Sequence, residues 1–144
     1  MIYTPMTKVA LKLCFETHKE QVDKTNMPYV FHPFHLAEQM DDEISTICAL
    51  LHDVVEDSET TLDDLREMGF TNEVIEVITL LTHKEDVPYM DYVREIKKNP
   101  VATKVKIADL THNSDLSRMD AREIDERAIK RNEKYAEALR ILRN

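Results

Sequence analysis

The sequence predicts an all-α fold, a compact helical bundle of about seven to eight helices in a single domain over residues 1–144. Three observations predict it. The chain contains one glycine, Gly69, and no Asn-Gly or Asp-Gly pair, whereas strand-rich folds use such residues at their turns. Apolar residues recur at helical spacing through most of the chain. The length of 144 residues and the 42% hydrophobic composition suit one globular domain.

The first helix is expected over residues 5–20. Its apolar positions follow i, i+3/i+4 spacing: Met6, Val9, Ala10, Leu13, Cys14 and Thr17. Residues 23–31 interrupt this pattern. The next helix begins at His32 and Pro33, because proline suits the first turn of a helix. The stretch from about residue 44 to residue 53 is apolar on nearly all sides and predicts the buried central helix.

Two helix signatures follow in the middle of the chain. Thr61 and Asp64 predict a capping arrangement for a short helix that ends at Gly69, a residue suited to the position after a helix C-terminus. Thr71 opens another helix. Its inner side is expected to carry Val74, Ile75, Val77, Ile78 and Leu81.

The C-terminal third predicts three more helices. Pro88 and Pro100 mark the starts of two, and Asn99 is expected to cap the second. The last helix is expected from about Asp120. Its inward side should carry Ile124, Ala128, Tyr135, Ala138, Leu139 and Leu142.

Charge and cysteine usage limit the class of function. The formal net charge of −9 disfavours nucleic acid and anionic membrane as partners, and it disfavours a phosphorylated ligand unless a bound cation offsets the charge. Cys14 and Cys48 match no metal-binding spacing and are expected to be reduced core thiols. The chain shows neither a signal-peptide pattern nor a long apolar stretch, so a cytoplasmic protein is expected. The oligomeric state is not readable from the sequence.

Polar residues at the end of the most apolar helix suggest a metal site. His52 and Asp53 stand there, where an unpartnered buried polar group costs about 1–3 kcal/mol. An imidazole and a carboxylate can ligate one divalent ion, and His32 and Asp109 are candidates for the remaining ligands. Glu56 lies four residues after His52. If the helix continues, its carboxylate could accept a proton from a metal-bound water.

Asp109 shares one helix face with Lys106 and Asn113, a combination that suits a metal and an anionic ligand. Each of these residues also has a structural interpretation, because a polar residue on a helix is usually a solvated one. The acidic run from Glu56 to Glu59 could likewise be only a surface loop. His18, His35, His83 and His112 are interpreted as structural, and His35 and His112, near the expected site, could support its ligands through hydrogen bonds.

Three strings decide between these interpretations: HP at 32–33, LLHDVVED at 50–57 and KIADLTHN at 106–113. Their order and spacing resemble the HD hydrolase domain of the RelA/SpoT-homologue family, and the similarity runs from His18 to Asn113. The ending DLSRM followed by RNEKYAEAL resembles small stand-alone members of this HD group. The resemblance implies an HD-type helical bundle.

The resemblance also implies roles for particular residues. It implies one divalent ion, usually manganese, with four ligands: His32, His52, Asp53 and Asp109. It implies a pair that activates or positions the attacking water: Glu56 and Asp57. Substrate contacts are expected from Lys24, Tyr29, Lys106 and Asn113.

The implied activity is that of a manganese-dependent guanosine-3′,5′-bis(diphosphate) 3′-pyrophosphohydrolase, which converts (p)ppGpp to GDP or GTP and pyrophosphate through metal-activated water. The chain is far too short for the synthetase half of the bifunctional members. Asp23, Leu110 and Asp115 stand where the family commonly has basic residues, which bears on the substrate. Two alternatives therefore stay open: an HD phosphatase acting on a nucleoside monophosphate or on the 2′-phosphate of NADPH, and a non-catalytic nucleotide-binding helical module.

Overall fold

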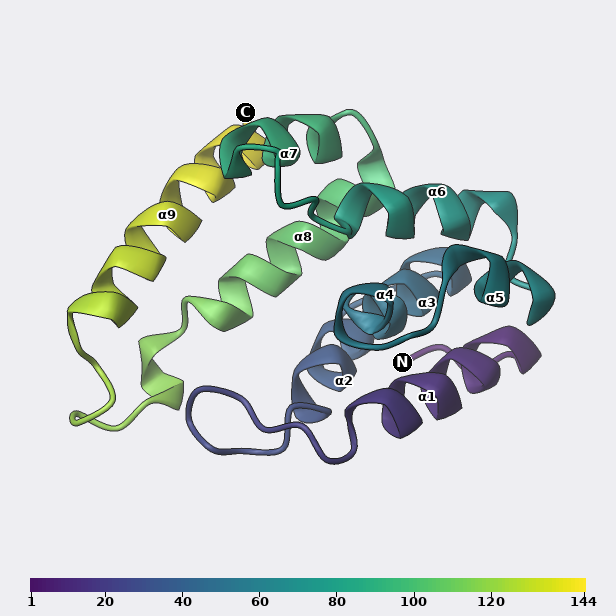
Figure 1. Cartoon of the computed structure of the whole chain (residues 1–144), viewed down its shortest axis with the longest axis horizontal. Coiled ribbons are helices and arrows are strands. Elements are labelled where there is room, and N and C mark those ends of the chain that lie inside the picture. The colour runs from purple at the N-terminus through teal and green to yellow at the C-terminus, as the bar shows by residue number, and fades with distance from the viewer.

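Helices form all the regular structure of the chain, and the computed structural model describes residues 1–144 (Figure 1). The predicted all-α class is confirmed. The elements are α1 (Pro5–His18), α2 (Phe31–Glu38), α3 (Glu43–Leu51), α4 (Val54–Asp57), α5 (Leu62–Glu67), α6 (Asn72–Leu81), α7 (Tyr89–Lys97), α8 (Pro100–Asn113), the short 3-10 helix η1 (Leu116–Arg118) and α9 (Glu126–Arg143).

Helix α3 occupies the centre of the bundle, as its apolar sequence predicts. It packs against α1, α2, α6 and α8, and every residue from Ser45 to Leu51 is buried. Helices α7 and α9 pack on the far side of α8, so one continuous core extends from α1 to α9. Cys14 and Cys48 are free and buried in this core, which confirms the prediction of reduced core thiols.

Helix ends follow the predicted caps in the middle of the chain. Thr61 and Asp64 form a reciprocal capping box at the start of α5. Gly69 follows the C-cap of α5 with φ +100°, a conformation that favours glycine over residues with a Cβ. Asn99 caps α8 by accepting hydrogen bonds from the N–H groups of Val101 and Ala102. Local side-chain chemistry therefore sets these boundaries.

Three predicted boundaries are wrong. Helix α1 ends at His18 rather than at residue 20. Helix α3 ends at Leu51 rather than at residue 53, and Asp53 is the N-cap of the separate one-turn helix α4. The last helix begins at Glu126, because Asp125 caps it by accepting from the N–H of Ala128, and residues 120–125 are not helical, with a turn at 121–123. Ile124, expected to face inward, is consequently 37% exposed.

No helix has both the length and the apolar composition that crossing a membrane requires.

Candidate active site

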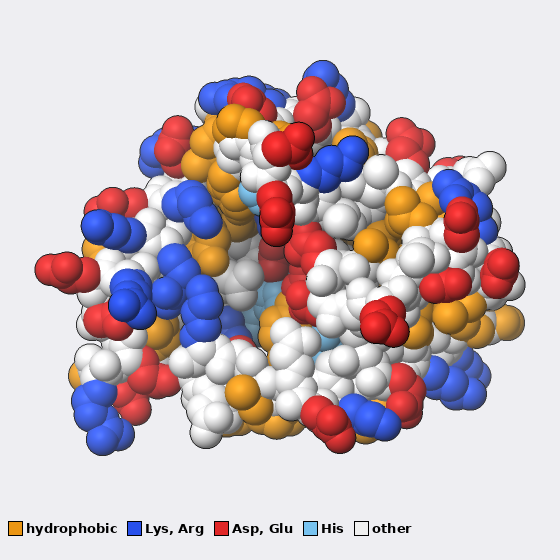
Figure 2. Space-filling view, in the orientation of Figure 1, with side chains coloured by type: hydrophobic (Ala, Val, Ile, Leu, Met, Phe, Trp, Pro, Cys, Tyr) orange, Lys and Arg blue, Asp and Glu red, His pale blue; other side chains and the backbone are white.

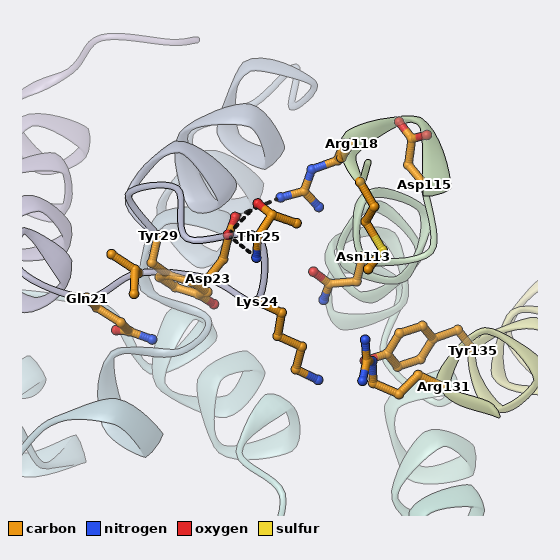
Figure 3. Close-up of a pocket in the computed structure, with 12 residues that line it drawn as sticks. Gln21, Asp23, Lys24, Thr25, Tyr29, Asn113, Asp115, Arg118, Arg131 and Tyr135 are labelled. Atoms are coloured by element: carbon orange, nitrogen blue, oxygen red, sulfur yellow. Dashed lines mark hydrogen bonds and ion pairs between the residues drawn. The ribbon is translucent and has the colours of Figure 1, made fainter. Parts of the chain in front are cut away.

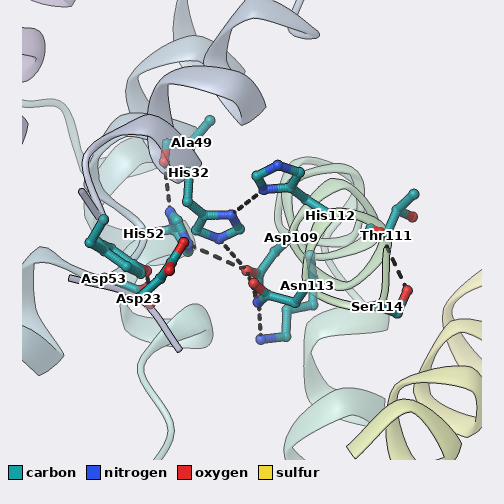
Figure 4. Close-up of polar contacts among 12 residues, drawn as sticks. Asp23, His32, Ala49, His52, Asp53, Asp109, Thr111, His112, Asn113 and Ser114 are labelled. Carbon is teal, nitrogen blue, oxygen red and sulfur yellow. Dashed lines mark hydrogen bonds and ion pairs between the residues drawn. The ribbon is translucent and has the colours of Figure 1, made fainter. Parts of the chain in front are cut away.

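Three of the four predicted metal ligands meet in the interior (Figure 4). His32 stands in the first turn of α2, His52 is the C-cap of α3, and Asp109 lies on α8. One ligand atom from each of these buried residues lies within 4.8 Å of the others. Two imidazoles and one carboxylate within this distance are a donor set that divalent transition metals accept. We call these three residues the ligand cluster.

Nε2 of His52 faces two carboxylates. The Nδ1 atom of His52 lies 2.7 Å from the carbonyl oxygen of Ala49, which only accepts, so Nδ1 carries a proton. Nε2 is buried without a hydrogen-bond partner, 3.2 Å from Oδ2 of Asp53 and 3.5 Å from Oδ1 of Asp109. Burial lowers the pKa of His52, but the two carboxylates hold it well above its usual range, so the position next to Nε2 favours a cation, either a proton or a metal ion.

Asp109 is the most heavily bonded member of the cluster. Its Oδ1 lies 2.9 Å from Nε2 of His32 and accepts from Nδ2 of Asn113 at 2.9 Å, while Oδ2 accepts from Nζ of Lys106 at 2.8 Å. Burial raises the pKa of this carboxyl, but Lys106 and the two histidines hold it well below its usual range. Lys106 and Asn113, predicted as substrate contacts, thus both bind Asp109.

His112, expected near the site as a group that could support the ligands, contacts the ligand cluster directly. Its Nδ1 lies 2.7 Å from Nδ1 of His32, and the exposed His35 ring stacks on it at 4.2 Å. Burial and the neighbouring His32 lower the pKa of His112 to about 4, so the ring is neutral near pH 7. The Nδ1 atom of a neutral His112 can accept a hydrogen bond from Nδ1–H of His32, which would leave Nε2 of His32 unprotonated for a metal.

Asp53, the fourth predicted ligand, lies beside the cluster and is oriented by Tyr29. The Tyr29 hydroxyl donates to Oδ2 of Asp53, and the Tyr29 ring packs between those of His18 and His32. Although burial raises the pKa of Asp53, the neighbouring His52 lowers it to about 2. The residue is therefore an ionised carboxylate at the edge of the cluster.

The acidic pair Glu56 and Asp57 lies on the separate turn α4, and each carboxylate has a partner from outside that turn. Glu56 Oε1 accepts from the backbone N–H of His83, and Asp57 Oδ2 accepts from Nε2 of Gln21 at 3.3 Å. Partial desolvation raises the pKa of both carboxyls, which suits groups that accept protons. The side chain of the buried His18 bonds to Gln21 at 2.8 Å and supports this arrangement.

Two pockets open beside these residues. The larger pocket, of about 370 Å³, contains three predicted contacts and is drawn in Figure 3. It is lined by Gln21, Val22, Asp23, Lys24, Thr25, Tyr29, Asn113, Asp115, Arg118, Met119, Arg131 and Tyr135. The smaller pocket, of about 140 Å³, is lined by His52, Asp53, Glu56, Leu81, His83, Tyr89, Tyr92, Val105, Lys106 and Asp109. The family commonly has a basic residue at the position of Leu110. Leu110 is buried in the core and lines neither pocket, so this departure does not remove a cation from the lining of either pocket.

Sequence reasoning missed the contribution of α9 to the larger pocket. Arg131 and Tyr135 are one turn apart on this helix, and both line the pocket. Tyr135 also packs against the core, as expected. Their i, i+4 spacing was the available signal. Burial lowers the pKa of Lys24, and the nearby cations Arg131 and Lys134 lower it further. Three cations close together attract an anion.

The two signs of charge lie on opposite sides of the site. In Figure 2, Lys and Arg side chains gather over the α9 side of a central hollow, and Asp and Glu side chains line its other side. Histidine atoms are visible within the hollow. A protein with a net charge of −9 thus keeps a positive wall beside its ligand cluster.

The chain is similar in sequence to proteins named guanosine-3′,5′-bis(diphosphate) 3′-pyrophosphohydrolase. The chain is 33% identical over 120 residues to the mouse guanosine-3′,5′-bis(diphosphate) 3′-pyrophosphohydrolase MESH1, covering 72% of this chain and 66% of the relative. It is 34% identical over 115 residues to human MESH1, covering 70% and 64%. A guanosine-3′,5′-bis(diphosphate) 3′-pyrophosphohydrolase of Aquifex aeolicus is 42% identical over 62 residues, which are 40% of this chain and 9% of that relative. No protein-family profile matches the chain.

The fold has a counterpart among solved structures. A structure described as a metazoan ortholog of SpoT that hydrolyzes ppGpp superposes with a TM-score of 0.78, covering 100% of this chain and 89% of that one at 22% identity. In sequence, the chain spans just under two thirds of the two MESH1 proteins, at 66% and 64%, and a small part of the Aquifex protein.

Proposed function

Because this chain belongs to the RelA/SpoT-homologue family of HD-domain proteins, we propose that it is a manganese-dependent (p)ppGpp 3′-pyrophosphohydrolase. The products would be GDP or GTP and pyrophosphate. One observation carries this proposal: a buried donor set of two histidines and one aspartate adjoins a pocket walled by cations. This arrangement supports a proposal in which a metal ion and the phosphates of a substrate bind next to each other.

The residues present fit a divalent ion. His32, His52, Asp53 and Asp109 would hold it, and the orphaned Nε2 of His52 supports this assignment. When bound, the ion would supply Lewis acidity toward a phosphoryl oxygen. Nitrogen and oxygen donors also accept iron, cobalt, nickel and zinc, so the choice of manganese rests on the family.

The acidic pair on α4 would handle the proton of the attacking water. Water attacks the phosphorus attached to the 3′ oxygen, the bond between them breaks, and the 3′ oxygen takes up a proton as pyrophosphate leaves. Glu56 or Asp57 accepts the proton that the water loses, because desolvation raises both pKa values. His83 and Gln21 hold the two carboxylates in place.

The larger pocket would hold the rest of the nucleotide. Lys24 and Arg131 are its free cations and would contact phosphate oxygens distant from the reacting bond. Tyr29 and Asn113 line the side next to the ligand cluster, where the ribose would lie. Positive charge confined to this wall allows an acidic protein to bind a polyanionic substrate.

A second candidate is an HD phosphatase acting on another nucleotide, favoured by the two carboxylates that line the larger pocket. Asp23 and Asp115 lie there in place of basic family residues. A substrate panel with manganese separates the candidates: pyrophosphate released from ppGpp supports the first, and orthophosphate released from a nucleoside monophosphate or NADPH supports the second.

The decisive experiment is an assay of ppGpp with metal-stripped protein to which manganese is returned. We expect GDP and pyrophosphate from the wild type, and no products from Asp53→Ala or in the presence of chelator. Asp63→Ala is the matched control, because this exposed carboxylate lies outside both pockets. Wild-type protein that binds manganese but leaves ppGpp intact would contradict the proposed substrate.

A further inference from the structure

Asp23 organises the loop that carries Lys24. Its Oδ1 accepts from the backbone N–H of Thr25 at 2.8 Å, from the Thr25 hydroxyl at 2.6 Å and from the N–H of Met27 at 3.1 Å. The backbone closes the same turn, since Asp23 N–H donates to the Met27 carbonyl at 2.8 Å and Asn26 has φ 63°. A carboxylate at position 23 thus builds this loop in a way that a basic residue could not.

The second oxygen of Asp23 joins this loop to a distant segment. Oδ2 accepts from Nη2 of Arg118 at 3.3 Å, and Nη1 of Arg118 donates to the His112 carbonyl at 2.8 Å. The side chains of Arg118 and Asp23 are 27% and 16% exposed, so water screens the pair only in part. The contact ties residues 22–28 to η1, which form two facing walls of the larger pocket.

The ion pair also distributes charge within the larger pocket. Figure 3 shows Asp23 and Arg118 together at one end, while the Lys24 side chain reaches toward Arg131 and Tyr135 at the other. The charge of Arg118 is balanced by its partner, whereas Lys24 has only cations acting on it. Because Asp115 also lines the Arg118 end, that end of the pocket has no excess of positive charge, whereas the Lys24 end is positive.

We propose that the Asp23–Arg118 pair is a specificity-determining clamp for the nucleoside end of the substrate. It fixes the separation of the two pocket walls and confines positive charge to the Lys24–Arg131 end, where a phosphoryl group binds. Arg118 is the last residue of η1, and Asp23 holds its side chain. The cation in this part of the pocket therefore comes from position 118 and not from position 23. This proposal rests on the proposed function, in that the larger pocket takes a nucleotide.

A double-mutant cycle tests the clamp with Asp23→Asn, Arg118→Met and their combination. Asn keeps an oxygen for the Thr25 and Met27 donors but removes the charge, so the loop itself should persist. The probes are GDP binding by calorimetry and steady-state ppGpp hydrolysis. We expect each single variant to weaken GDP binding and raise KM about tenfold with kcat within about twofold, and the double variant to add little.

Two further variants sharpen the cycle. Arg118→Lys keeps the charge and should retain part of the affinity, and Arg122→Met is the matched control because Arg122 is 92% exposed outside both pockets. Additive single effects, or GDP affinities within twofold of wild type, would overturn the clamp. If the wild type binds GDP but does not hydrolyse ppGpp, only the proposed function is refuted. The double-mutant cycle measured by GDP calorimetry then decides whether the clamp exists. Wild type that binds no GDP would overturn the clamp.

Discussion

The ligand cluster and the larger pocket adjoin each other, yet different kinds of structure hold them. The cluster stands on helices α2, α3 and α8, which pack together in the core. The pocket is framed by the loop around Lys24, the segment around Arg118 and the exposed side of α9. Rigid helices therefore position the groups expected to hold the metal, while loops position the groups expected to select the substrate. A substitution in a loop can alter recognition without disturbing the cluster.

The departures from the family pattern follow this division. Asp23 and Asp115 lie in the loops and line the larger pocket, and the three residues of the ligand cluster are retained. Leu110 also departs from the family pattern, but its side chain is buried in the hydrophobic core and does not line the larger pocket. We therefore expect substitutions in the larger pocket to change ligand recognition without removing the ligand cluster.

The largest effect is expected from Asp109→Ala, which tests whether the cluster also supports the fold. This change leaves Lys106, whose side chain is 13% exposed, without its carboxylate partner. We expect loss of manganese binding, loss of activity and a free energy of unfolding lowered by about 3–5 kcal/mol. Urea denaturation of the metal-free protein measures the last effect. A metal-free variant as stable as the wild type would show that the cluster serves function alone.

An intermediate effect is expected from Lys24→Met, which removes a cation from the pocket but no buried contact. We expect KM for ppGpp to rise about tenfold, because a charged hydrogen bond to phosphate is lost. Unfolding free energy should change by less than about 0.5 kcal/mol, as is usual for exposed sites. Lys19→Met, on an exposed residue outside both pockets, is the control. An unchanged KM would remove Lys24 from the binding site.

The smallest effect is expected from Gln21→Leu, because it removes neither a residue of the ligand cluster nor one of the free cations Lys24 and Arg131. Gln21 donates to Asp57 and so lowers a pKa that desolvation raises. Its loss should raise the pKa of Asp57 further. If Asp57 acts as the base, activity falls as pH drops through this pKa, so the acidic limb of the kcat profile should move to higher pH. A profile that keeps its position would assign the base to Glu56.

The helical pattern and the three residues of the ligand cluster could be predicted, because both are marked by short stretches of sequence. Apolar spacing and caps identify α5, α6 and α8 with little error, and the motif strings identify His52 and Asp109. The break between α3 and α4 could not be predicted, because residues 50–57 keep helix-compatible composition while Asp53 leaves the helical conformation at φ −111°, ψ 1°. Glu56 is therefore placed by His83, a partner 27 positions away.

The sequence by itself determined the all-helical class, the buried central helix and the residues that supply nitrogen and oxygen donors, because these follow from local periodicity and from residue chemistry. Tertiary structure alone decided which polar groups meet. Asp23 reads in sequence as a lost cation, and in the fold it holds Arg118 from 95 positions away. Lys106 and Asn113 read as substrate contacts, and in the fold they bind Asp109. Hydrogen bonds between distant segments depend on how the helices pack, which no local pattern specifies.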